Sequence, residues 1–228
     1  MTKVSGTISA EYGPTGRYVT CEKEYGMVEE WTKNKSKKRL LNHPEYLRFI
    51  EALNSIRLVK EGAIMFYRGR PRKCVKTISD SRWMGPPPSD SCIKGGRYNK
   101  KGESVLYLSD SEQGVKDELQ YHYGSDIKIV IQNYKIPTHQ LKIADLTSYE
   151  RTSLINAVMW HCELANHSGY CSIRFSQMIA EILEIQKFDG AKVFGVRGDG
   201  SKILYNNVFI FNPLDRWKDW VVGRPYLI

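Results

Sequence analysis

The sequence predicts an α+β domain in which strands and helices alternate irregularly along one chain. Two patterns support this prediction: short apolar runs bounded by turn residues are typical of strands, and several segments place apolar residues at helical spacing. No repeat or low-complexity tract interrupts their order. With 228 residues, the chain is long enough to bury a substantial core.

Residues 1–62 are predicted as an N-terminal extension packed on the main domain. Residues 1–40 lack sustained periodicity. Beyond them, a proline suited to a first helical turn precedes apolar residues at helical spacing, which predicts an amphipathic helix near residues 44–58. The residues of this pattern are Pro44, Tyr46, Leu47, Ile50, Leu53 and Ile56.

The main domain is predicted over residues 63–212, beginning with a buried strand at residues 63–68 that delivers Arg68 and Arg70 at its end. A connection of roughly thirty residues follows, because three consecutive prolines and several glycines cannot continue a helix or a central strand. Loops of this length in compact domains are usually functional or disordered. The aromatic residues and Arg97 in this loop favour function.

The next strand is predicted at residues 104–108, and Ser109-x-x-Glu112 is a capping-box pattern that starts a helix reaching about Tyr121. The remaining prediction comprises strands at 127–131, 141–146, 193–196 and 207–211, helices at 149–165 and 176–186, a hairpin turn at Gly198-Asp199-Gly200, and a C-terminal tail at 213–228.

Composition argues against several classes of protein. The longest apolar runs fall far short of the roughly 20 residues needed to span a bilayer, and the first residues do not form a signal peptide. Five cysteines without a Cys-x-x-Cys pair indicate neither a disulfide framework nor a zinc site, and the His161-Cys162 pair lacks further ligands. We therefore expect a cytoplasmic protein with reduced thiols, no bound metal and no membrane partner.

The formal net charge of +9 would attract either nucleic acid or an anionic small substrate such as a dinucleotide. Part of the excess lies in a basic run at residues 33–39, which is typical of a solvated stretch. No nucleic-acid-binding motif accompanies it, so we do not expect nucleic acid as a partner. A basic nucleic-acid-binding module remains an alternative.

Four stretches, in their order and spacing, resemble the RES-domain family, which is named for an arginine, a glutamate and a serine. They span about residues 63–212. The stretches are Phe66-Tyr67-Arg68-Gly69-Arg70; Pro86-Pro87 followed by Gly96-Arg97-Tyr98-Asn99; Leu106-Tyr107-Leu108 with Glu118 eleven residues after the tyrosine; and Phe175-Ser176-Gln177 leading to Phe188-Asp189-Gly190.

The resemblance implies an ADP-ribosyltransferase-like fold, with two small sheets around an NAD cleft and flanking helices. Family members degrade NAD⁺ by hydrolysis or phosphorolysis, or transfer ADP-ribose to a protein, and bacterial members are commonly toxins held inactive by a cognate antitoxin. It therefore implies a toxin-like enzyme with NAD⁺ as substrate and an antitoxin as partner. The alternatives are transfer of ADP-ribose to a protein target and a non-catalytic NAD-binding module.

Carried over residue by residue, the resemblance assigns NAD⁺ binding to Arg68, Arg97, Tyr107 and Glu118, with Glu118, Tyr107 and Arg68 as the catalytic set. The family serine falls near Gly195, so a glycine stands where a hydroxyl is expected. Two nearby serines, Ser176 and Ser201, are not indicated as substitutes.

Cleavage of the nicotinamide–ribose bond develops positive charge on the ribose beside a doubly anionic pyrophosphate. Arginine forks match phosphate oxygens, and a carboxylate such as Glu118 can hydrogen-bond a ribose hydroxyl and favour the developing charge. The Tyr107 ring can stack on nicotinamide or hold the ribose. Without the family pattern, Glu118 would be interpreted as a solvated charge or a partner of Lys116 or Lys128. Three further arginines are interpreted as surface charges: Arg70, Arg72 and Arg82.

Overall fold

The computed structural model describes residues 41–42, 44–54, 56–92, 95–147, 172–195 and 205–228. The basic run at 33–39, the helix expected at 149–165, the His161-Cys162 pair, the turn at 198–200 and Ser201 lie outside these residues. The chain divides into two compact units, residues 1–56 with 148–178 and residues 57–147 with 179–228. All four predicted site residues belong to the second unit.

Helix α3 (Pro44–Asn54) lies in the first unit, and it buries Tyr46 and Leu53, as its periodicity predicts, whereas Leu47 is 64% exposed. It ends four residues before the predicted boundary at residue 58. The chain is already extended there, because Leu58 forms a β-bridge with Ala144 in the second unit.

The second unit is built on one mixed seven-stranded sheet in the order β4-β5-β6-β2-β1-β3-β7. Only β4 and β5 pair in parallel; the other neighbours are antiparallel. The strands are β1 (Ala63–Pro71), β2 (Val105–Ser109), β3 (Ile129–Pro137), β4 (Ile143–Asp145), β5 (Gly190–Phe194), β6 (Asn206–Phe211) and β7 (Val221–Leu227).

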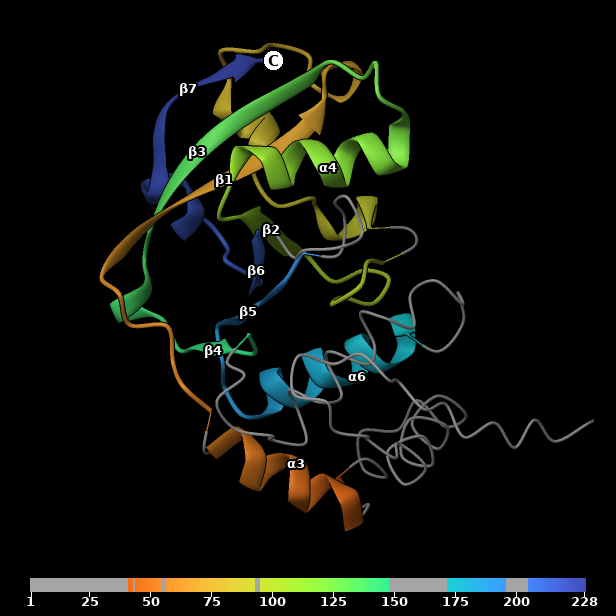
Figure 1. Ribbon diagram of the computed structural model, residues 1–228, viewed down its shortest axis with the longest axis vertical. Helices are drawn as coiled ribbons and strands as arrows, with labels where there is room; N and C mark the ends of the chain where they lie inside the picture. Colours follow the sequence, from red (N-terminus) through yellow and green to blue (C-terminus); the bar gives the residue numbers. More distant parts are fainter. Residues whose placement is uncertain (1–40, 43, 55, 93–94, 148–171, 196–204) are drawn as a thin grey trace, which may run out of the picture. The chain divides into compact units, whose positions relative to one another are not determined.

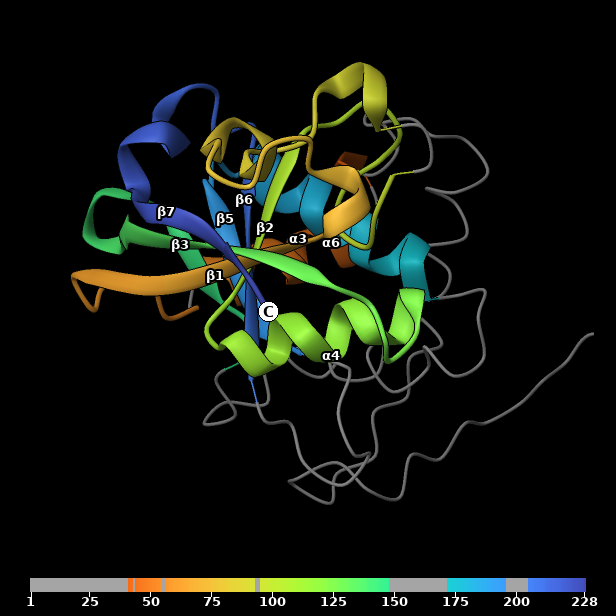
Figure 2. The ribbon, with the colours of Figure 1, turned by 90° about the horizontal axis from the view of Figure 1, so that it is seen from above.

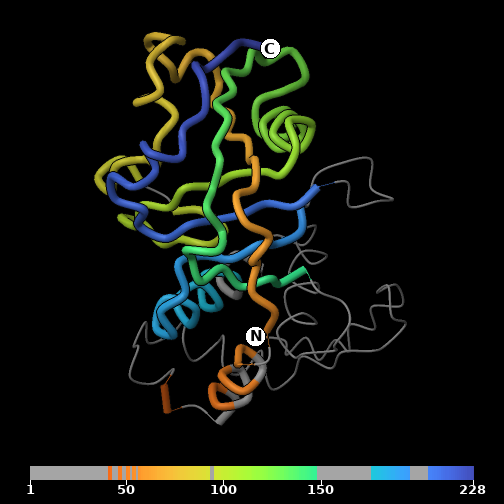
Figure 3. Tube along the Cα trace, turned by 90° about the vertical axis from the view of Figure 1, so that its left-hand side faces the viewer, coloured from red at the N-terminus to blue at the C-terminus, as the bar shows by residue number. Residues whose placement is uncertain are grey.

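The sheet consists of two limbs that meet at a single point. Strands β1, β3 and β7 form the β1 limb, and strands β2, β6, β5 and β4 form the β2 limb. Whereas β1 pairs with β3 along its whole length, it pairs with β2 only at Tyr67 and Ser109. Figure 3 shows the strands of one limb running across those of the other. The two small sheets that the family resemblance implies are therefore limbs of one continuous sheet.

The core fills the space between the limbs. Phe66 and Tyr134 from the β1 limb pack with Leu106 and Ile210 from the β2 limb. Because successive side chains of a strand point to opposite faces, Tyr67 and Gly69 face away from this core. They face helix α4 (Glu112–Tyr123), which lies along β1 and β3 (Figures 1 and 2).

The cap of α4 differs from the predicted capping box. Ser111 is the N-cap residue and accepts a hydrogen bond from the Gly114 amide at 2.9 Å, whereas Ser109 is the last residue of β2. The helix then follows the predicted course but continues two residues beyond Tyr121. Helix α6 (Ser172–Ile185) begins four residues before the predicted Ser176.

The long connection after β1 contains three short 3₁₀ turns: η1 (Arg72–Cys74), η2 (Ser81–Met84) and η3 (Ser89–Ser91). The segment predicted as a C-terminal tail is also ordered, since it forms η6 (Arg216–Trp220) and the edge strand β7. The sequence does not predict β7, because Gly223 and Pro225 are atypical of strands. Both residue types are nevertheless tolerated at a sheet edge. No helix in the described part of the chain has the length and apolarity needed to cross a bilayer.

Candidate functional site

Arg68 occupies the wedge where the two limbs diverge. If the pairing of β1 with β2 continued past Tyr67, Arg68 would lie opposite Leu108, but the ladder stops. Instead, Arg68 Nη1 donates a hydrogen bond of 2.9 Å to the carbonyl oxygen of Tyr107 on β2. This side chain therefore joins the limbs where backbone hydrogen bonds do not.

The Arg68 guanidinium is a buried charge with incomplete compensation. The residue is only 8% exposed, and its Nε has no hydrogen-bond partner. Among the described residues, no carboxylate pairs with it. Burial, reinforced by the neighbouring charge of Arg70, lowers the pKa of Arg68 to about 10, so the group is cationic at neutral pH. A buried, unpaired charge is costly, which makes this wedge attractive to an anion.

The other arginines of this region differ in exposure. Arg70, interpreted from the sequence as a surface charge, is partly buried and donates to the Gly85 carbonyl at 3.0 Å. Burial lowers its pKa below the ordinary value. Arg72 is also partly buried and donates to the carbonyl of Val75. Arg82 is a surface charge, as expected, since its side chain is 84% exposed and pairs with an aspartate.

The hydroxyl of Tyr107 is engaged within the protein. It donates to Asn99 Oδ1 at 2.7 Å and accepts from the Tyr98 amide at 2.9 Å. Burial raises the pKa of Tyr107 well above its ordinary value, so the hydroxyl keeps its proton. The ring lies tilted against Phe209, and Tyr98 stacks on the same ring at 4.3 Å. These contacts give Tyr107 a supporting role for the loop, beside the stacking role expected from the sequence.

The loop supported by Tyr107 holds Arg97. Gly96 and Asn99 form a β-bridge that encloses Arg97 and Tyr98. This turn requires glycine, because a Cβ at Gly96 would lie 2.6 Å from Asn99 Oδ1 and 3.0 Å from the Tyr107 hydroxyl. Tyr107 thus connects both predicted arginines, one through its carbonyl and one through its hydroxyl.

Glu118 is tied to strand β6 and is not a freely solvated charge. Its Oε1 accepts a hydrogen bond of 3.0 Å from the Tyr205 hydroxyl and one of 2.9 Å from Asn207 Nδ2. The alternative partner Lys116 pairs instead with Glu112, at 3.5 Å. Asn207 lies opposite Ser109, whose other cross-strand neighbour is Tyr67. The Glu118 carboxylate is therefore anchored at the junction of the limbs, beside the Arg68 strand.

Gly195, which stands near the position of the family serine, provides space for Tyr205. The Tyr205 side chain is buried, and a Cβ at Gly195 would lie 2.1 Å from its ring. Gly114 bounds the ring as well, since a Cβ there would approach it to 2.4 Å. A serine at 195 would therefore displace Tyr205. Ser176 is buried in α6, in the first unit.

The structure links Arg68 directly to Tyr107, and the Tyr107 hydroxyl accepts from the Tyr98 amide, next to Arg97 in the same turn. Glu118 reaches the same junction through β6, without a direct bond to these three in the described part of the chain. Its partners Tyr205 and Asn207 are not among the residues predicted for the site. Their spacing of two residues at the start of a predicted strand was the available signal, because it places both side chains on one face.

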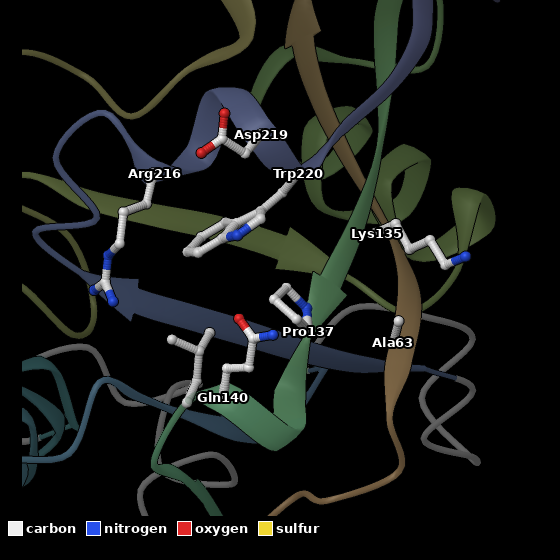
Figure 4. Close-up of a pocket in the computed structure, with 8 residues that line it drawn as sticks. Ala63, Lys135, Pro137, Gln140, Arg216, Asp219 and Trp220 are labelled. Atoms are coloured by element: carbon white, nitrogen blue, oxygen red, sulfur yellow. The ribbon is translucent and has the colours of Figure 1, made fainter.

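A pocket of about 400 Å³ lies elsewhere, between η6, the end of β3 and the start of β1 (Figure 4). None of the four predicted residues lines it. Its lining combines two cations, one carboxylate and an indole: Ala63, Lys135, Pro137, Gln140, Leu141, Arg216, Asp219 and Trp220. Within the described residues, no group of three or more His, Cys, Asp or Glu side chains is arranged to hold a metal.

No protein-family model matches the chain, and no curated protein matches it. Among solved structures, the chain is similar to the crystal structure of the M. tuberculosis MbcT–MbcA toxin–antitoxin complex. The similarity has a TM-score of 0.48 and 13% sequence identity, and it covers 79% of this chain and 89% of the other.

Proposed function

We propose that the protein is a toxin-like enzyme that cleaves NAD⁺ at the nicotinamide–ribose bond. The observation that supports this most directly is the buried Arg68 guanidinium, which has an unpartnered Nε and no carboxylate partner among the described residues. A charge in this position is stabilised when an anion pairs with it. The pyrophosphate of a dinucleotide is an anion of the right geometry for arginine forks.

A dinucleotide would find further cationic groups around this wedge. Arg70 lies two residues along β1, and Arg97 lies in the turn held by the Tyr107 hydroxyl. Hydrogen bonds within the protein hold Arg68 and the turn, which reduces the conformational entropy that binding must remove. We assign pyrophosphate binding to Arg68 and Arg97, with Arg70 reinforcing the positive charge.

Glu118 would act on the ribose. Both of its hydrogen bonds fall on Oε1, so Oε2 is left to accept a bond from a ribose hydroxyl. As the nicotinamide–ribose bond breaks, its electron pair leaves with nicotinamide and positive charge develops on the ribose. A carboxylate fixed nearby stabilises this charge more in the transition state than in the ground state. Water or phosphate then completes the reaction at the ribose carbon.

The decisive experiment measures nicotinamide release from NAD⁺ by the purified protein, with and without phosphate. We expect release by the wild-type chain and a loss of at least about a hundredfold in Glu118→Gln, because the developing charge loses its stabilisation. Asp117→Asn on the same helix is the matched control and should retain activity. Absence of NAD⁺ loss above the buffer control, in either buffer, would refute the proposal.

The products identify the acceptor. Free ADP-ribose indicates hydrolysis, whereas a requirement for phosphate indicates phosphorolysis. Appearance of the ADP-ribose label on protein would indicate transfer to a protein target. The proposal includes a cognate antitoxin as a partner. Because the enzyme would consume NAD⁺, the proposal also predicts that expression of the chain arrests bacterial growth, whereas expression of Glu118→Gln does not.

A further inference from the structure

We propose that Tyr205 is a positioning residue for the reaction, acting through the Glu118 carboxylate. This inference rests on the proposed function, in which Glu118 faces the ribose. Tyr205 is absent from the motifs that suggested the site, and it lies 87 residues from Glu118 in the chain. Its role follows from three features of its surroundings.

The first feature is convergence on one atom. The Tyr205 hydroxyl and Asn207 Nδ2 both donate to Glu118 Oε1, at 3.0 and 2.9 Å. Two donors at the same oxygen restrict both the position of the carboxylate and its rotation. Hydrogen bonds to an ionised acceptor are stronger than those between neutral groups, so the restraint is effective even though Glu118 is only half-buried.

The second feature is the space made for the ring. Tyr205 is 3% exposed and lies where a Cβ at either Gly195 or Gly114 would intrude, at 2.1 and 2.4 Å. Gly195, directly after β5, and Gly114, in the first turn of α4, thus leave room for one aromatic ring. The ring is held on both sides, which fixes the direction of the hydroxyl.

The third feature is the anchoring of the start of β6, which Tyr205 directly precedes. The intervening residue, Asn206, is held by Asp110: its backbone amide donates at 2.8 Å and its side-chain amide at 2.7 Å. Residues 205 and 207 therefore keep their register relative to α4. The result is a rigid support that leaves Glu118 Oε2 as the oxygen directed to substrate.

The test replaces the hydroxyl while keeping the ring, in Tyr205→Phe. We expect kcat for NAD⁺ cleavage to fall by about tenfold with KM within about twofold, because the carboxylate loses a restraint that matters most in the transition state. Tyr226→Phe is the matched control: its hydroxyl donates to Glu112 Oε2 on the same helix, at 2.7 Å. This control should retain wild-type kcat.

A second measurement does not depend on turnover. In a thermal double-mutant cycle of Tyr205→Phe with Glu118→Ala, we expect each single change to lower Tm by about 2–6 °C and the double change to cost less than the sum. Coupled losses support the restraint even if wild-type protein leaves NAD⁺ intact, a result that would refute only the proposed function. Additive Tm losses, or a Tyr205→Phe kcat equal to that of Tyr226→Phe, would overturn the positioning role.

Discussion

The Arg68 wedge and the pocket of Figure 4 differ in opposite ways: the pocket has volume but a paired cation, whereas the wedge has an unpaired buried cation. The pocket encloses about 400 Å³, but Arg216 on its wall already has a carboxylate partner, Asp189, at 3.4 Å. The wedge holds a buried guanidinium with an unpartnered Nε. An unsatisfied buried charge is the stronger indication of a ligand, because it identifies the chemistry that a ligand must supply.

The largest contrast between the two regions is expected from removing their arginines. Arg68→Met should reduce NAD⁺ cleavage by at least about a hundredfold while the protein stays folded at the assay temperature, since removal of the buried charge offsets part of the cost of about 1–3 kcal/mol for leaving the Tyr107 carbonyl unsatisfied. Arg216→Met should leave cleavage unchanged. Steady-state rates and melting curves of both proteins test this, and equal losses of activity would place the site in the pocket.

Arg97→Lys tests whether Arg97 binds the pyrophosphate through its forked geometry, because the substitution keeps the charge. An ammonium cannot reproduce a two-pronged contact, so NAD⁺ affinity should fall by roughly ten- to a hundredfold. Neutralising Lys35, Lys37 and Lys38 together is the control and should alter only salt-dependent, nonspecific binding. Calorimetric titration with ADP-ribose measures both. If Arg97→Lys kept its affinity for ADP-ribose and the triple variant lost it, the binding site would lie in the basic N-terminal region.

Gly195→Ser tests the support beneath Glu118. The new side chain would collide with the Tyr205 ring, and overpacking of this kind costs about 1–3 kcal/mol, or roughly 2–12 °C in Tm. The loss should shrink when Tyr205→Ala is added, because the ring no longer competes for the space. Differential scanning fluorimetry of the single and double variants provides the comparison. If Gly195→Ser left Tm unchanged, the Tyr205 ring would not occupy the space beside residue 195.

The smallest effect is expected at the pocket. The ion pair of Arg216 with Asp189 is partly exposed, and such pairs contribute about 0–1 kcal/mol. Arg216→Gln should therefore shift Tm by less than about 4 °C and make it less sensitive to salt. Melting curves at low and high ionic strength measure this. A larger shift would show that the pocket wall is structurally important.

Much of the fold follows from periodicity in the sequence. A strand is predicted by the apolar run at 63–68, and a helix by the spacing of Tyr46 and Leu53. Both are predictable because the side chains that an element buries recur at a spacing set by neighbouring residues in the chain. Strand β7 was missed because Gly223 and Pro225 resemble turn residues. Only the tertiary structure shows that this segment completes the edge of β3.

The candidate site was predictable in its residue types but not in its contacts. The motifs single out Arg68, Arg97, Tyr107 and Glu118, yet nothing local indicates that the Tyr107 hydroxyl faces Asn99. Asn207 is 89 residues from Glu118, and this pairing depends on how α4 packs beside β6. That Gly195 leaves room for a ring is likewise a property of the packed structure.

The single register pair between β1 and β2 makes the junction of the limbs the most weakly laddered boundary in the sheet. A substrate bound to Arg68 on one side and to Glu118, anchored on β6, on the other would act as a clasp across this boundary. Its binding would reduce motion between the limbs as well as fill a site. Affinity would then depend on the stiffness of the junction, so that substitutions far from the ligand, in the core between the limbs, would change it.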